Sequence, residues 1–171
     1  MKKHMVLALS LMAASTAAVA QTSFYATADY TAYDLEVSGG GSASFGALGV
    51  AGGVKLNEFL AAEVRLATGA NDEDLGNGVS FGLESYIGAQ LVGSLPLDKN
   101  FSLYGTLGYG EAEVQASQGN VRITDSDTGL SYGAGVQYDM GNLGLRVGYE
   151  SIYDSNGIEV DGFKLTGIYR F

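Results

Sequence analysis

The feature that most constrains this chain is an alternation of apolar residues with small or polar residues at period 2, which recurs along most of its length. The last nine residues are the clearest case. Their apolar face carries Phe163, Leu165, Gly167, Tyr169 and Phe171. Their polar face carries Lys164, Thr166 and Arg170. Because successive side chains of a β-strand point to opposite faces, we expect a final strand with one face for lipid and one for water.

Seven earlier segments share this pattern, at residues 24–33, 46–56, 60–67, 80–95, 101–110, 130–138 and 143–150. Short turns near Asn57, Pro96 and Gly141 alternate with longer polar connections at 34–44, 69–79, 111–129 and 151–161. An up-and-down barrel places successive connections at opposite ends, so every short turn falls at one rim. The pattern therefore predicts an all-β fold, an eight-stranded antiparallel up-and-down transmembrane β-barrel with both termini on the short-turn side.

A soluble barrel of the lipocalin kind would show the same alternation with its faces exchanged. The composition of the two faces argues against it, because the Gly- and Ala-rich face also holds the ionisable residues. These are Asp29, Glu63, Arg65, Glu84, Arg146, Glu150 and Lys164. Small side chains beside large charged ones suit the narrow interior of an eight-stranded barrel. We therefore predict that these seven residues form a charge network in the lumen.

Symmetric hairpins predict which lumen residues face one another. A hairpin centred on Asn57 would place Ala51 opposite Glu63 and Gly49 opposite Arg65. One around the turn at Gly141 would place Gly135 opposite Arg146, and one centred on Asn156 would place Lys164 opposite Gly148, diagonally between Arg146 and Glu150. A hairpin centred near Asp74 would bring Glu84 beside Arg65 or Glu63.

The first twenty residues have the form of a secretory signal peptide. Lys2 and Lys3 precede an apolar run at 5–14, and Ala18-Val19-Ala20 is a small-x-small cleavage site before Gln21. No later segment offers about 20 uninterrupted apolar residues for a spanning helix. We predict a signal peptide at 1–20 and one β-barrel domain at 21–171.

Charge and cysteine content limit the partners of the predicted domain. Without Lys2 and Lys3, seven of the 9 basic residues remain against 19 acidic ones, and 7 minus 19 gives a formal charge of −12. Nucleic acid is excluded as a partner, because phosphate contacts need clustered Lys and Arg. There is no Cys, so neither disulfides nor thiolate metal sites can form.

The chain resembles the small eight-stranded outer-membrane β-barrel proteins, the family of the OmpA membrane domain, OmpX, Ail and the opacity proteins. The resemblance rests on the strand count, the loop asymmetry, the segment 130–138 and the terminal Tyr-Arg-Phe. It implies the outer membrane of a Gram-negative bacterium and an assembly signal formed by Phe163, Leu165, Tyr169 and Phe171. It also implies outer-membrane lipids, lipopolysaccharide and the barrel-assembly machinery as partners, and a monomeric chain.

Catalysis finds no support in the sequence. Barrel enzymes of this membrane depend on a His base, and the only His here is His4, within the predicted signal peptide. No catalytic, cofactor-binding or metal site is predicted, and Asp125-Ser126-Asp127 lacks the alternating ligands and distal Glu of a calcium loop. The acidic connections would either share divalent cations with lipopolysaccharide or form a solvated, repulsive surface.

Two functions remain open at this point. The leading one is a membrane anchor whose surface loops serve envelope integrity or surface interaction and adhesion, with any extracellular ligand bound by the loops. The alternative is a small-conductance pore whose charged lumen acts as a gate, as the resemblance to OmpA would allow. Charges in a narrow barrel must pair or be hydrated, which favours a static plug over a gate.

Overall fold

The computed structural model describes residues 23–37, 41–71, 73–74, 79–118, 121–153 and 159–171, so the predicted signal peptide lies outside the described residues. Within them the chain forms β1 (Ser23–Val37), β2 (Gly41–Lys55), β3 (Leu60–Asn71), β4 (Glu73–Asp74), β5 (Val79–Pro96), β6 (Phe101–Gln118), β7 (Val121–Met140), β8 (Leu143–Tyr153) and β9 (Glu159–Arg170). No helix in this part of the chain is long and apolar enough to cross a membrane.

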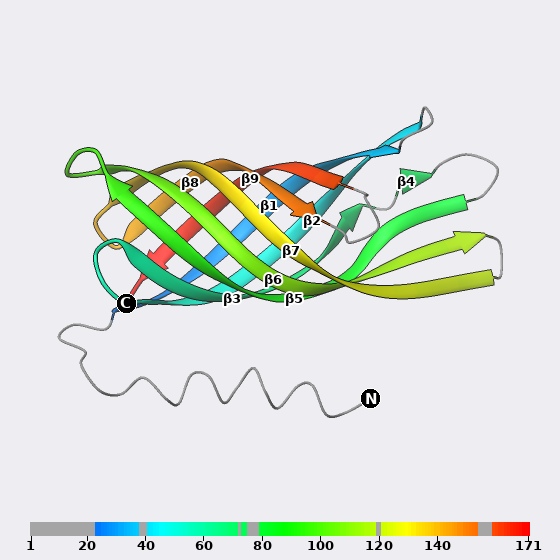
Figure 1. Cartoon of the computed structure of the whole chain (residues 1–171), viewed down its shortest axis with the longest axis horizontal. Coiled ribbons are helices and arrows are strands. Elements are labelled where there is room, and N and C mark those ends of the chain that lie inside the picture. The colour runs from blue at the N-terminus through cyan, green and yellow to red at the C-terminus, as the bar shows by residue number, and fades with distance from the viewer. Residues whose placement is uncertain (1–22, 38–40, 72, 75–78, 119–120, 154–158) are drawn as a thin grey trace, which may run out of the picture.

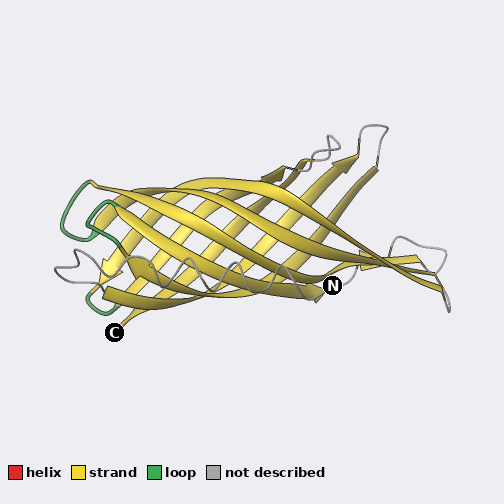
Figure 2. Ribbon diagram, turned by 60° about the horizontal axis from the view of Figure 1, so that its bottom comes forward, coloured by secondary structure: helices red, strands yellow, loops and turns green. Residues whose placement is uncertain are grey.

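The strands close into a barrel (Figure 1). Neighbouring strands pair antiparallel in the order β3-β2-β1-β9-β8-β7-β6-β5-β4, and a further pairing of β3 with β5 completes the ring. Since β4 is a two-residue strand beside β5, the ring itself consists of eight strands within the described residues. The predicted antiparallel up-and-down fold is confirmed. The described turns at 56–59, 97–100 and 141–142 lie at the same end as the C-terminus (Figure 2).

The outer wall is apolar and the interior is polar, as the alternation predicted. Leu48, Val50, Leu91 and Leu107 are about half exposed, whereas their sequence neighbours on the other face are buried or partly buried. Exposed aromatic side chains occur near both ends of the strands, as in the aromatic girdles of membrane barrels. They include Phe24, Tyr30, Phe101, Tyr109, Tyr138, Tyr149, Phe163, Tyr169 and Phe171.

Two hairpin registers differ from the prediction by two residues. Glu63 pairs with Gly53 and Arg65 with Ala51, because the first short turn is centred on Glu58, one residue later than predicted. The Leu56 and Asn57 amides both donate to the Leu60 carbonyl oxygen, at 2.9 and 3.1 Å.

Arg146 similarly pairs with Gln137, whereas the prediction placed it opposite Gly135. The reversal there consists of Gly141 and Asn142, and Gly141 has a φ of +68°, a left-handed conformation that glycine adopts without steric cost. The pairing of Lys164 with Gly148 is as predicted.

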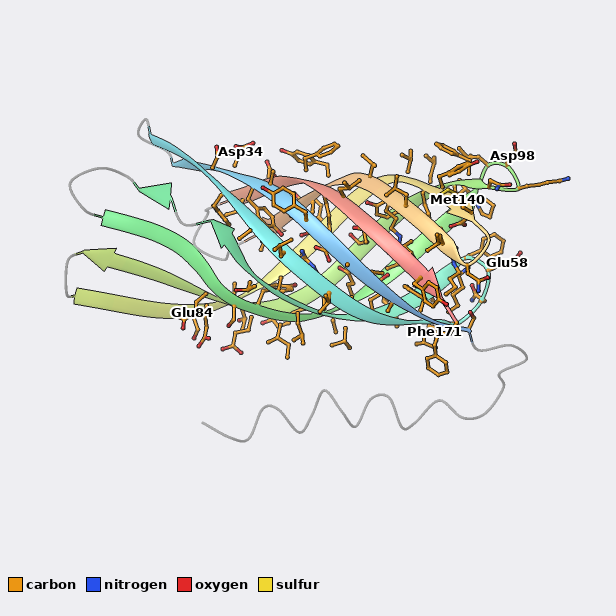
Figure 3. The ribbon with its side chains drawn as sticks, turned by 180° about the vertical axis from the view of Figure 1, so that it is seen from behind. Asp34, Glu58, Glu84, Asp98, Met140 and Phe171 are labelled. Atoms are coloured by element: carbon orange, nitrogen blue, oxygen red, sulfur yellow. The ribbon has the colours of Figure 1, made fainter. Side chains whose placement is uncertain are left out.

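Glu84 does not lie beside Arg65 or Glu63, which pair with Gly88 and Gln90. A β-bulge between Leu83 and Ser85 leaves Glu84 without a partner on β6, and its side chain is exposed. Figure 3 shows it on the outside of the ribbon, at the end opposite Glu58, Asp98 and Phe171. The bulge interrupts the alternation that the prediction assumed to be continuous.

The predicted long connection at 111–129 is also wrong, because strand pairing continues through most of it. β6 reaches Gln118 and pairs with β7 from Val121 onward, and β5 pairs with β6 as far as Val79. These residues form a three-stranded sheet that extends past the rest of the barrel (Figure 1). We call residues 79–85, 111–118 and 121–129 the β5–β7 extension. On β6, Glu111 and Glu113 there take the outward positions that apolar residues such as Leu107 and Tyr109 hold in the barrel wall.

Candidate functional site: the lumen and the β5–β7 extension

Six of the seven predicted lumen residues lie inside the barrel. Asp29 comes from β1, Glu63 and Arg65 from β3, Arg146 and Glu150 from β8, and Lys164 from β9. Their relative exposures lie between 3% and 8%. Each occupies an inward position of its strand, and together they comprise three acidic and three basic groups. The lumen is therefore balanced in formal charge.

Four of these residues form one cluster around Arg65 and Glu150. The Arg65 guanidinium contacts Asp29 at 2.5 Å and Glu150 at 3.1 Å. Lys164 Nζ contacts the other oxygen of Glu150 at 2.6 Å, and the Tyr33 hydroxyl donates to Glu150 at 2.6 Å. A single carboxylate thus joins two cations and a tyrosine from three other strands. This arrangement holds β1, β3, β8 and β9 together across the barrel.

The remaining pair, Glu63 and Arg146, forms a second cluster nearer the short turns. Their closest atoms are 2.7 Å apart. Glu63 also accepts hydrogen bonds from Tyr25 at 2.7 Å and Gln90 at 2.5 Å. The Arg146 guanidinium lies over the rings of Tyr25 and Tyr104, 5.8 and 5.4 Å from their centroids. Hydrogen bonds and ring contacts together fix the position of both charges.

Polar contacts continue from this second cluster to the barrel rim. Arg146 Nε donates to Gln137 at 2.7 Å, and the Gln137 amide donates to both carboxylate oxygens of Asp139 at 3.0 and 3.1 Å. Asp139 in turn forms an ion pair with Arg170. Periodicity did not identify this pair, since Asp139 belongs to the strand end that leads into the turn.

The free space beside the two charge clusters is small. A cavity of about 20 Å³ lies between the two clusters, bordered by Asp29, Glu63, Arg65, Arg146, Glu150 and Lys164 among others. That volume accommodates about one water molecule. Among the described residues, every buried side-chain nitrogen and oxygen has a hydrogen-bond partner, and no group of His, Cys, Asp and Glu is arranged to hold a metal ion.

The lumen partners that sequence reasoning missed are mostly tyrosines. Tyr25, Tyr33, Tyr86 and Tyr104 are all buried, and Tyr86 lies under the Arg65 guanidinium at 5.5 Å. They share the inward parity of the charged residues, and this signal could have identified them. The residues of the predicted assembly signal, Phe163, Leu165, Tyr169 and Phe171, are exposed on the outer wall, and their role in assembly stays a prediction.

The formal charge of the barrel domain is concentrated at the end opposite the C-terminus. By sequence position, thirteen of the 19 acidic residues fall within 34–44, 69–84, 111–129 and 151–161, the segments that join or extend the strands at that end. Arg122 is the only basic residue in those segments. Of the other six acidic residues, three are in the lumen and three, Glu58, Asp98 and Asp139, are near the short turns.

A closed barrel with a lipid-compatible wall, two aromatic girdles and a charged, filled interior defines the class of transmembrane outer-membrane β-barrels. Residues 5–171 match the family model described as an outer membrane protein beta-barrel domain, and the chain belongs to this family. It is a protein of the outer membrane of a Gram-negative bacterium. In such barrels the short turns face the periplasm, so the β5–β7 extension is extracellular.

Solved structures support the same fold. Neisserial surface protein A is 20% identical with a TM-score of 0.75, and the match covers 86% of this chain and 97% of that one. Ail of Yersinia pestis is 19% identical with a TM-score of 0.64, covering 88% and 99%. OprH from P. aeruginosa is 16% identical with a TM-score of 0.57, covering 87% and 99%. No curated protein matched the chain in a sequence comparison.

Proposed function

We propose that this protein is a non-enzymatic membrane anchor whose extracellular strands interact with another surface. The observation that carries the proposal is the β5–β7 extension, in which three paired strands rise beyond the points where β3 and β8 stop pairing with their neighbours. Ordered strands present a fixed backbone to a partner, and binding to them costs less conformational entropy than ordering a loop. Envelope integrity is the second role open to the same extracellular segments.

The filled lumen supports an anchor more than a pore. Ion passage would require the Arg65–Glu150 and Arg146–Glu63 pairs to separate, and each separation would leave a buried charge without its partner. Breaking a buried ion pair costs about 3–5 kcal/mol. The pore alternative therefore needs a second arrangement in which these groups find new partners.

The lack of a His outside the predicted signal peptide supports the non-enzymatic part of the proposal, since His is the base most often used in catalysis and the only one here is His4. We further propose that outer-membrane lipids and lipopolysaccharide surround the outer wall. The barrel-assembly machinery would recognise the exposed face of β9, and the chain would act as a monomer. No cofactor or metal has a role in this function.

One structural relative illustrates surface attachment. Ail is named the attachment invasion locus protein of Yersinia pestis, and it has also been crystallised with the heparin analogue sucrose octasulfate. At 21% identity the likeness of that complex to this chain extends to the fold alone. A polyanionic ligand would not suit the thirteen acidic residues on the extracellular side here.

Trimming the extension tests the proposed function. Residues 113–126 can be replaced by Asn-Gly, because Ala112 and Asp127 are paired and a two-residue turn can join them. Bacteria carrying the trimmed protein are expected to lose most of the adhesion that the full chain confers on strains lacking it. Adhesion would be counted on animal cell layers, coated plates and cells of the same strain.

Two further measurements on the same cells show whether a loss of adhesion is due to the missing extension itself. Surface labelling should show equal amounts of the full-length and the trimmed protein. Entry of a hydrophobic dye, which reports the permeability of the outer membrane, should not differ between the two strains. Unchanged adhesion in the trimmed strain would contradict a surface-interaction role. Increased dye entry with unchanged adhesion would indicate that the extension serves envelope integrity instead.

A further inference from the structure

A second cavity lies at the mouth of the lumen on the short-turn side. It measures about 20 Å³ and is distinct from the cavity between the two charge clusters. Among the described residues that border it, three are cations, Lys55 from β2, Arg146 from β8 and Arg170 from β9, and one, Glu58, is acidic. Figure 3 shows Glu58 at the same end as Phe171. The cavity is therefore at the periplasmic end of the barrel.

Two of the three cations already have partners. Arg146 forms its ion pair with Glu63 at 2.7 Å. Arg170 forms an ion pair with Asp139 and also donates to two backbone carbonyl oxygens of the turn at 3.3 Å. Neither Glu63 nor Asp139 borders the cavity. Positive charge therefore exceeds negative charge around this space.

Lys55 differs from the other basic residues of the interior. It occupies an inward position at the end of β2 and is partly buried. Among the described basic side chains at inward positions, it is the one without an ion pair. Its charge is near enough to Arg170 and Arg146 to be repelled by both, and Asp139 attracts it without a direct contact. A partly buried ammonium group beside two further cations favours the binding of an anion.

The shape and the lining of the cavity limit the class of anion. A volume of about 20 Å³ has room for about one water-sized group, so an oxygen of an anionic head group can enter while the rest stays at the mouth. Ala61 pairs with Lys55 and borders the cavity with Tyr25 and Ile168. This partly apolar lining suits a small planar carboxylate next to a carbon chain better than a larger phosphate. Ammonium and guanidinium groups both donate charge-assisted hydrogen bonds to carboxylates.

We propose that this cavity binds a carboxylate group from the periplasm, with Lys55 Nζ as its principal donor and the Arg170 guanidinium as the second. The inference goes beyond the proposed function, which concerns the opposite end of the barrel, and does not depend on it. A free small acid and a longer periplasmic molecule that carries a carboxylate both present the required chemistry. A longer molecule would give the anchor a point of attachment on its inner side.

Nuclear magnetic resonance of the isotope-labelled, refolded protein in phosphatidylcholine nanodiscs tests the proposal. The probes are N-acetylalanine and N-acetylalaninamide, which differ only in a carboxylate or a neutral amide, at constant ionic strength. The backbone amide resonances of Lys55, Asn57 and Ala61 should shift saturably with the acid, with half-saturation at about 1–10 mM, the affinity of about two charge-assisted hydrogen bonds. Equal shifts with both probes, or no saturable shift with the acid up to about 100 mM, would overturn the proposal.

Three further probes define the class and the source of the ligand. Inorganic phosphate should bind more weakly than acetate, and tighter binding of phosphate would overturn the assignment to a carboxylate. Acetate and N-acetylalanylalanine distinguish the two sources. Equal affinities would assign the site to a small free acid. Binding of the dipeptide at least about threefold tighter would assign it to a carboxylate on a longer molecule that gains contacts at the mouth.

Paired lysine variants locate the site on the protein. Lys55→Gln should weaken binding of N-acetylalanine by about fivefold or more, because it removes the unpaired charge but keeps a hydrogen-bond donor. The matched control, Lys99→Gln, removes an exposed charge from a neighbouring turn that does not border the cavity, and should leave binding unchanged. Equal effects of the two variants would contradict a site at Lys55. The dispersion of the amide resonances verifies that each variant is folded.

A variant with the opposite expected effect provides an independent check. Glu58 is exposed at the mouth of the cavity, where its negative charge opposes an approaching carboxylate. Glu58→Gln should therefore tighten binding of N-acetylalanine by about twofold at low salt. Weaker binding in this variant would show that the ligand is not attracted as an anion, and would overturn the proposal.

Discussion

Replacing Glu150 with Ala is expected to lower the free energy of unfolding of the barrel by about 3–5 kcal/mol. The change removes the only carboxylate that contacts Lys164 and one of the two that contact Arg65, within the described residues. It also removes the acceptor of the Tyr33 hydroxyl. Lys164 would then lose its ion pair, and Arg65 would keep only Asp29. Equilibrium unfolding in urea, with the protein refolded into lipid vesicles, measures the difference.

Glu84→Ala is the matched control for this prediction. Glu84 belongs to the same barrel and was expected in the same lumen network, but it is exposed. Its replacement should change the free energy of unfolding by no more than about 0.5 kcal/mol. If Glu150→Ala proved no more destabilising than Glu84→Ala, the lumen cluster would not be a stabilising element of the fold.

Gly135→Ala is expected to destabilise the barrel by about 1–3 kcal/mol, although it adds a single methyl group. Gly135 faces the lumen opposite Gly148. A Cβ built there would overlap the Val147 carbonyl oxygen and approach the Gly148 Cα to 2.6 Å. Both are backbone atoms of the adjacent strand β8, so relief would require the two strands to separate. Urea unfolding in vesicles again gives the measurement.

Gly167→Ala provides the comparison. Gly167 is on the outer wall of β9, where the nearest atom to an added Cβ is the Ala28 carbonyl oxygen at 3.8 Å. That substitution should be neutral or stabilise by about 0.4–1 kcal/mol, because Ala restricts the unfolded chain more than Gly does. A cost for Gly167→Ala as large as that for Gly135→Ala would show that loss of glycine itself, rather than crowding of the lumen, is responsible.

The sequence predicted which side chains of each strand point inward more accurately than it predicted the register between neighbouring strands. Lipid outside and a narrow lumen inside impose a strict period of 2, so the inward positions of Asp29, Arg65 and Lys164 followed from parity alone. Register depends on how many residues each turn contains. The turn after Lys55 and the reversal at Gly141 each shifted the expected pairing by two residues, and a shift of two preserves every face.

The errors occurred where lipid no longer constrains the chain. Glu84 lies at a bulge on the extracellular side, and a bulge reverses parity locally without an apolar pattern to reveal it. The strands at 111–118 and 121–129 carry polar residues such as Glu111, Glu113 and Ser126 at outward positions, so they lack the apolar outer face by which a membrane strand is recognised. Backbone pairing with a neighbour, which leaves no mark in composition, holds them in the sheet.

Single-channel conductance of the refolded protein in a planar bilayer tests the central claim, that the barrel is a filled anchor. Recordings would span a range of voltages and salt concentrations, with folded protein verified in the same preparation. The paired charges and the cavity of about 20 Å³ predict a steady baseline without openings. Discrete openings whose size or frequency changes in Lys164→Ala would contradict it, and would show that the Lys164–Glu150 pair is part of a gate.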